Sequence, residues 1–225
     1  MLLDFYRSAL GKKTVMAVTG LALFGFVLGH MLGNLKIFLG AEALNHYAEW
    51  LREIGAPLLP HGGLLWIARL GLLAAVGLHI VSAWQVTQIN RKARPQDYAN
   101  RATIQASYAS RTMRWGGVLI ALFVLYHLAH FTWGYAWAHP DFVAGDVYHN
   151  VVAGFQVWWI SAFYVVAQLA LALHLYHGLW SLFQSLGWNH PNLNAWRQTF
   201  AKAFAALVFV GNVSFPISVL AGWVG

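Results

Sequence analysis

Five stretches of this sequence are apolar and long enough to cross a lipid bilayer as α-helices. They lie at about residues 14–35, 64–90, 115–137, 157–186 and 203–223. Each reaches the roughly 20 residues that are needed to span the hydrocarbon core. Only 9% of the 225 residues are charged, whereas soluble domains average about 25%. The sequence therefore predicts an all-α membrane protein, with residues 1–225 forming a single integral membrane domain of five transmembrane helices.

The basic residues are distributed unevenly between the two sides of the predicted membrane. Only Lys36, Arg52 and Arg69 lie on the side that carries the first and third connections, and five acids accompany them there. The other side holds eleven: Arg7, Lys12, Lys13, Arg91, Lys92, Arg94, Arg101, Arg111, Arg114, Arg197 and Lys202. Because cytoplasmic segments are enriched in Lys and Arg, we expect the N-terminus in the cytoplasm and the C-terminus outside. This distribution explains the basic residues without a nucleic-acid partner.

Two absences narrow the chemistry that the chain can support. It contains no cysteine, which excludes iron–sulfur ligation, thioether-attached haem and disulfides within this chain. No Asp or Glu lies inside a predicted span, although proton and cation carriers usually place carboxylates there. A cofactor bound by this chain must therefore be held by His, Met or oxygen donors.

Histidines inside the predicted spans are the strongest functional signal. Imidazole is costly in hydrocarbon unless its nitrogens are used, and four different helices each contribute at least one. The six are His30, His79, His127, His130, His174 and His177. A haem iron has two axial positions, so four histidines on four helices could hold two haems. The alternative for any single histidine is an interhelical hydrogen bond.

The depths of these histidines separate them into two layers. With about 1.5 Å per residue, His30 lies in an outer layer with His127 or His130. In the same way, His79 lies in an inner layer with His174 or with His177. Residues three apart share a helix face, so only one of each His-x-x-His pair is a ligand and the other contacts a propionate or a quinone. Depth alone slightly favours His130 and does not separate His174 from His177.

Glycine and arginine residues near these layers have two interpretations each. Gly25, Gly29 and Gly33 recur beside His30, where small residues favour either close helix packing or room for a porphyrin. Arg69, near the outer end of the second span, either neutralises a propionate or extends to the interface. Arg114 is a second candidate to contact a propionate or an axial ligand.

Short motifs along nearly the whole chain carry a family resemblance. They are Gly11-Lys12-Lys13 followed by Met16 and Thr19-Gly20, Gly29-His30-Met31-Leu32-Gly33-Asn34, Leu78-His79, Tyr126-His127-Leu128, and His174-Leu175-Tyr176-His177-Gly178-Leu179-Trp180-Ser181. In this order the motifs resemble the membrane-anchor subunit of succinate dehydrogenase/fumarate reductase, in its single-chain, five-helix, dihaem cytochrome b form. The resemblance implies a bundle of the first four helices. It also implies that His30 and His127 bind the outer haem, and that His79 and His174 bind the inner haem.

The resemblance also implies partners and a location. A flavoprotein subunit would oxidise succinate, and an iron–sulfur subunit at the cytoplasmic face would exchange electrons with this anchor in a prokaryotic cytoplasmic membrane. Two b haems would relay those electrons to or from a quinone dissolved in the lipid, typically menaquinone, and copies of the complex could associate further. The quinone-site candidates near the inner haem are Gln85, His177, Trp180 and Ser181. Some dihaem members carry a glutamate where this chain has Ala172, so a proton route through that residue is not supported.

Three other functions compete with this interpretation. A dihaem cytochrome b subunit of a hydrogenase or formate dehydrogenase would share the cofactor but differ in its partner. A membrane non-haem metal enzyme requires clustered and often adjacent histidines, which this chain lacks. A transporter that moves protons on histidines is disfavoured by the absence of carboxylates in the spans.

Overall fold

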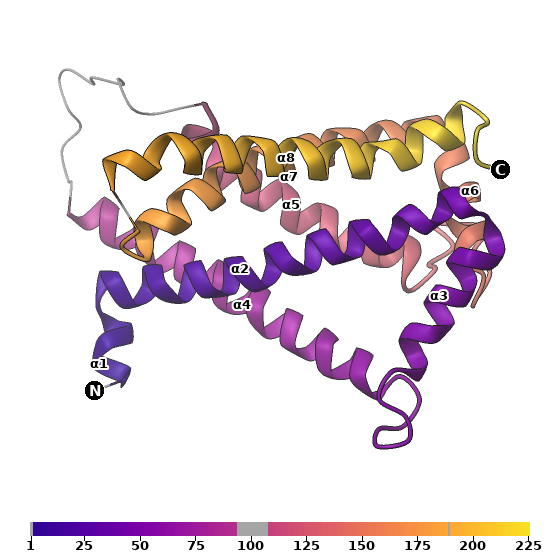
Figure 1. Ribbon diagram of the computed structural model, residues 1–225, viewed down its shortest axis with the longest axis horizontal. Helices are drawn as coiled ribbons and strands as arrows, with labels where there is room; N and C mark the ends of the chain where they lie inside the picture. The colour runs from indigo at the N-terminus through magenta and orange to yellow at the C-terminus, as the bar shows by residue number, and fades with distance from the viewer. Residues whose placement is uncertain (1, 94–107, 189) are drawn as a thin grey trace.

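The computed structural model describes residues 2–93, 108–188 and 190–225, and within these ranges it contains helices and turns but no strand. The elements are α1 (Leu2–Arg7), α2 (Ala9–Asn34), the 3-10 helix η1 (Leu35–Leu39), α3 (Ala41–Glu53), α4 (Gly63–Lys92), α5 (Tyr108–Phe131), α6 (Val147–Gln156), α7 (Trp158–Ser185) and α8 (Pro191–Leu220). The long helices run between two ends of the molecule, with the N-terminus at one end and the C-terminus at the other (Figure 1). The prediction of an all-α membrane protein is confirmed.

Five helical segments of the described chain can cross a membrane. They are Ala9–Leu39, Gly63–Lys92, Met113–Phe131, Trp158–Ser185 and Asn192–Leu220. The third helix ends at Phe131 rather than near residue 137. Trp133 and Trp137 prolong the apolar stretch in the sequence, but Gly134 takes a φ of 60° and turns the chain. This left-handed conformation is one that glycine adopts readily and that ends a helix.

The two ends of the bundle are named here after the membrane orientation that the basic residues predict. We call the end with α1 and the turn between α7 and α8 the inner end, in keeping with the predicted orientation. The outer end carries α3, α6 and the C-terminus (Figure 1). Of the basic residues assigned to the inner side, Arg94 and Arg101 lie outside the described residues.

Close side-chain packing holds α8 against α2. A Cβ at Gly211 of α8 would come within 2.4 Å of the Met31 sulfur, so Met31, which is 2% exposed, packs directly on the α8 backbone. Phe24 of α2 stacks on Phe204 of α8 at 4.0 Å between ring centroids. Small residues are what allow membrane helices to approach in this way. As a result, α2 is fixed against α8.

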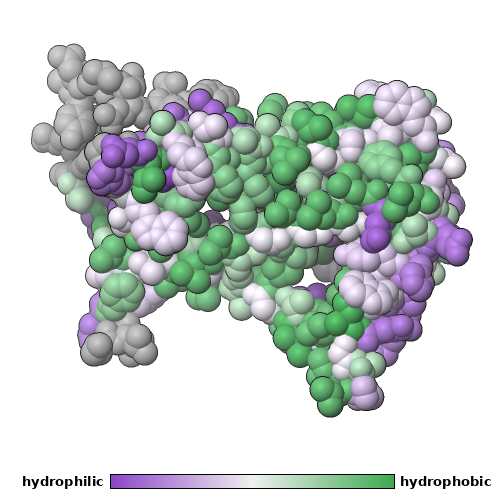
Figure 2. Space-filling model, viewed as in Figure 1, coloured by the Kyte–Doolittle hydropathy of each residue, from purple (hydrophilic) through white to green (hydrophobic). Residues whose placement is uncertain are grey.

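Helix α4 is attached much less closely than the other long helices. All its residues are described, and only Ser82 is fully buried. The helix crosses α2 and then diverges from it toward the outer end, where α3 connects the two (Figure 1). Hollows open in the molecular surface between α4 and the helices beside it (Figure 2). Helix α4 is therefore incompletely covered by the neighbouring helices.

Polar contacts join the connections at the outer end. Asn45 of α3 donates from Nδ2 to the Asp146 carboxylate at 2.9 Å and accepts from the backbone N–H of Tyr148 at 2.9 Å. Asp146 also caps α6 by accepting from the backbone N–H of His149 at 3.0 Å. Since a helix N-terminus leaves N–H groups without intrahelical partners, Asp146 satisfies one of them and ties α6 to α3.

Stability at acidic pH should depend on Asp146. The hydrogen bond from the His149 N–H, and then that from Asn45, hold the pKa of its carboxyl below the usual value, which is about 3.9 in an unfolded chain. The charged carboxylate therefore stabilises the fold above about pH 4, and this contribution is lost as pH falls through the lower native pKa. Thermal melts in detergent should show a steeper acid loss for the wild type than for Asp146→Asn. Asp141→Asn is the matched control, and equal pH profiles for the wild type and Asp146→Asn would contradict the prediction.

Candidate functional site

The outer histidine layer brings His30 of α2 beside His127 of α5. Their ring centroids lie 5.9 Å apart and their planes are nearly perpendicular, at 85°. Nε2 of His30 lies 3.3 Å from the side-chain amide nitrogen of Asn34, which can donate to it. A nitrogen that accepts this hydrogen bond carries no proton, and a metal bound at Nε2 of His30 would take the place of the Asn34 amide.

The inner layer pairs His79 of α4 with His174 of α7. Their ring centroids are 6.4 Å apart and their planes are inclined at 62°. Nδ1 of His79 lies 3.1 Å from the Met16 carbonyl oxygen and 3.2 Å from the Thr19 hydroxyl. The hydroxyl donates to the Val15 carbonyl at 2.7 Å, so both oxygens can accept from a protonated Nδ1. This tautomer leaves the Nε2 lone pair of His79 available, as in many metal-binding histidines.

Glycines lie against both inner imidazoles. A Cβ at Gly20 of α2 would lie 3.2 Å from Cε1 of His79, and a Cβ at Gly117 of α5 would lie 3.6 Å from Cε1 of His174. Gly25 and Gly29 have no neighbour within 4 Å, whereas a Cβ at Gly33 would come within 2.7 Å of Tyr47. Gly33 therefore serves helix packing, while Gly25 and Gly29 border open space.

Both histidine pairs fit an iron bound between two imidazoles. A bond from a metal to an imidazole nitrogen is about 2 Å long, so two imidazoles on opposite sides of one metal have ring centres roughly 6 Å apart. The distances of 5.9 and 6.4 Å match this requirement. The two histidine pairs are therefore compatible with two haems, and imidazole is a donor that haem iron accepts.

The comparison with known families identifies a family of membrane subunits. The succinate dehydrogenase/fumarate reductase transmembrane subunit family matches residues 89–213, which is more than half of the chain. The chain belongs to this family. The matched part contains His127 and His174 but not His30 and His79, which lie before it. No curated protein and no solved structure matches the chain.

The remaining histidines of this transmembrane subunit take different positions. His130 is fully buried, and its Nδ1 lies 2.9 Å from the Tyr164 hydroxyl. It packs on α6 so closely that a Cβ at Gly154 would lie 2.8 Å from its Nε2. His177 lies one helical turn beyond His174, and its buried Nδ1 has no hydrogen-bond partner among the described residues. Depth slightly favoured His130 as the partner of His30, but in the structure His130 turns toward α6 and α7.

Both arginine candidates for a propionate are exposed. Arg69 stacks over the Trp66 ring at 5.0 Å from the ring centroid. Arg114 lies in the inner half of α5. Neither arginine has an ion pair among the described residues. The stacking on Trp66 suits an arginine at the membrane interface.

The quinone candidates are divided between two helices of the subunit. Gln85 of α4 accepts a hydrogen bond from the Tyr6 hydroxyl at 3.0 Å, a contact with α1 that the sequence did not predict. Ser181 of α7 donates to the Gly178 carbonyl of its own helix at 3.2 Å, and Trp180 packs on the apolar core. No hydrogen bond or ring contact among the described residues joins Gln85 to these two side chains.

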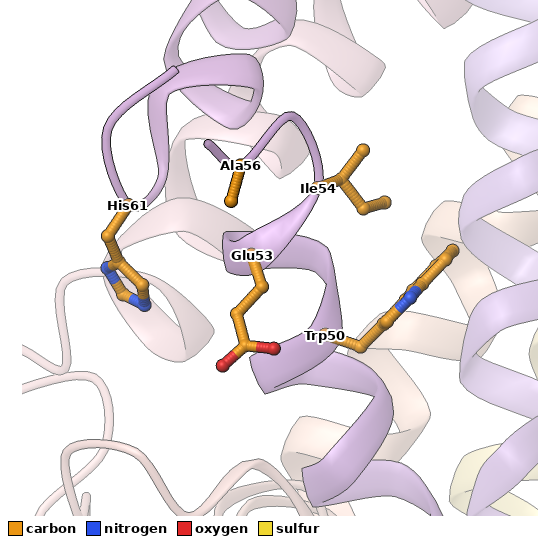
Figure 3. A pocket seen from close by; sticks show the side chains of 5 residues that line it. All are labelled: Trp50, Glu53, Ile54, Ala56 and His61. Atoms are coloured by element: carbon orange, nitrogen blue, oxygen red, sulfur yellow. The ribbon is translucent and has the colours of Figure 1, made fainter. Parts of the chain in front are cut away.

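An open cavity of about 440 Å³ lies at the outer end, where α3 meets the connection to α4. Its lining comprises Trp50, Glu53, Ile54, Ala56 and His61, and the Glu53 carboxylate lies between the Trp50 and His61 side chains (Figure 3). Beside it, Glu49 pairs with His61 at 3.0 Å and with Arg52 at 3.2 Å. The His61 hydrogen bond is the main cause of the lowered pKa of Glu49. All three acids of α3, Glu42, Glu49 and Glu53, are exposed.

Proposed function

We propose that this chain is the cytochrome b membrane anchor of a succinate:quinone oxidoreductase and that it holds two b haems, each between two histidines. The observation that carries the proposal is the separation of two histidine pairs, 5.9 Å for His30 and His127 and 6.4 Å for His79 and His174. Family membership supports the assignment to a succinate dehydrogenase or fumarate reductase complex.

Each part of the chain has a defined task in this proposal. Bound haem supplies reversible one-electron transfer, and the protein tunes it through axial ligands, hydrogen bonds and burial. The Met16 carbonyl fixes the His79 tautomer, and the apolar helices together with the surrounding lipid would keep water away from the imidazoles. Electrons would enter at the inner end from an iron–sulfur subunit that receives them from a succinate-oxidising flavoprotein. They would leave to menaquinone at Gln85, His177, Trp180 and Ser181.

The competing functions fit these residues less well. A dihaem subunit of a hydrogenase or formate dehydrogenase would not be expected to match the succinate dehydrogenase/fumarate reductase family. A non-haem metal enzyme needs at least three close ligands, and the described residues contain no such group of His, Asp or Glu. A transporter would be expected to place carboxylates in its spans.

The decisive experiment is pyridine haemochrome analysis of the purified chain, together with a dithionite-reduced minus oxidised spectrum. We expect two b haems per chain, both low spin, and co-purification with flavin-containing and iron–sulfur subunits from the native membrane. One haem per chain would contradict the two-pair arrangement. A folded chain made with adequate haem that binds none would overturn the proposal.

A further inference from the structure

The Tyr164 hydroxyl lies between two histidines of α5. It is 2.9 Å from Nδ1 of His130 and 3.4 Å from Nδ1 of His127. Tyr164 is 4% exposed and His130 is fully buried. The Tyr164 ring is held by Phe123 and Phe155, each at 5.0 Å between centroids. The hydroxyl therefore has little freedom to find another partner.

Ligation fixes the direction of these hydrogen bonds. If His127 binds a metal through Nε2, its Nδ1 carries the proton and donates to the Tyr164 oxygen. The Tyr164 O–H is then free to donate to Nδ1 of His130, which accepts. In this orientation Nδ1 of His127 donates, the Tyr164 hydroxyl accepts that bond and donates the next, and Nδ1 of His130 accepts.

The corresponding contact in the inner layer differs in chemistry. Nδ1 of His79 faces the backbone carbonyl of Met16, which no side-chain substitution can remove. Nδ1 of His127 faces a phenol, whose strength as an acceptor depends on its own donation to His130. The hydrogen bond at His127 can therefore be altered alone.

We propose that Tyr164, oriented by His130, is a positioning residue that sets the ring orientation of His127 and the reduction potential of the outer haem independently of the inner one. The inference rests on the proposed function. A hydrogen bond accepted from Nδ1–H makes the imidazole a more basic ligand. A more basic ligand favours the oxidised iron, so the Tyr164 oxygen lowers the potential of the outer haem.

The test is a redox titration of both haems, followed optically, in the purified complex that carries Tyr164→Phe. We expect both haems to remain and the outer midpoint to rise. A tenfold change in its reduction equilibrium is about 59 mV for one electron. The inner midpoint should not move. The g-values of the oxidised outer haem should change as well, because the ring of His127 loses its orienting contact.

Tyr126→Phe is the matched control. Its hydroxyl is also buried, directly before His127, but has no hydrogen-bond partner among the described residues. We expect neither midpoint to change in this variant. Equal shifts in Tyr126→Phe and Tyr164→Phe would assign the effect to packing and overturn the inference.

His130 provides a second pair of variants in case Tyr164→Phe loses the outer haem. His130→Asn keeps an acceptor near the Tyr164 hydroxyl and should retain a potential close to that of the wild type, whereas His130→Phe should shift it. Identical potentials in both would overturn the inference. A wild-type complex without an outer haem would instead overturn the proposed function. Two haems with an unmoved outer midpoint in Tyr164→Phe would overturn this inference alone.

Discussion

His174→Ala is expected to lower the haem content of the purified chain from two per chain to one. The ring of His174 lies 6.4 Å from that of His79, and alanine would remove one of the two ligands proposed for the inner haem. Even partners behind an axial ligand change metal affinity about 10–100-fold when they are removed, and loss of the ligand itself should cost more. Pyridine haemochrome analysis measures the content directly.

His177→Ala is the matched control for this experiment. It removes a histidine from the same helix, three residues away, and no contact joins His177 to His79 among the described residues. We expect this variant to keep two haems. Retention of two haems by His174→Ala, with loss of one in His177→Ala, would reverse the assignment of the inner ligand.

The sequence was sufficient to predict the membrane helices because their physical cause is local. A span requires only a long run of apolar residues, and the fourth span, predicted at 157–186, is α7 at Trp158–Ser185. The end of the third span was wrong because hydropathy does not report backbone conformation. Trp133 and Trp137 are apolar, but the helix ends at Phe131 and the positive φ of Gly134 turns the chain between the two tryptophans.

The choice within each His-x-x-His pair depends on information that spacing does not contain. Residues three apart differ by one helical turn in depth but also in direction around the helix axis. His127 faces His30 in the structure, while His130 fits against the α6 backbone at Gly154. Helix α6 is distant in sequence, so the direction of His130 was not predictable from α5 alone.

Tyr164 and Gly20 illustrate what only the tertiary structure reveals. Tyr164 is one of nine tyrosines, and nothing in its local sequence connects it to His127, 37 residues earlier. Gly20 belongs to the family motif, but its closeness to His79 depends on how α2 and α4 pack against each other. Both residues act through contacts between helices.

Gly20→Val is expected to remove the inner haem and leave the outer one. A Cβ at this position would lie 3.2 Å from Cε1 and 3.6 Å from Nδ1 of His79. Alanine adds only that carbon, and a displacement of a few tenths of an ångström should accommodate it, so Gly20→Ala should keep both haems. Valine adds two further carbons with a restricted χ1. The imidazole must then leave the Met16 carbonyl and its position opposite His174.

Combining the substitutions distinguishes a local effect from general unfolding. Gly20→Val and His174→Ala act on the same haem, so the double variant should retain one haem per chain, as each single variant does. Such non-additivity is expected when two substitutions disrupt one shared interaction. The outer pair, His30 and His127, serves as the internal control, because its haem should keep its spectrum and midpoint in all three proteins. A double variant without haem would show that Gly20→Val disturbs the outer layer, and the direct contact between Gly20 and His79 would not explain its effect.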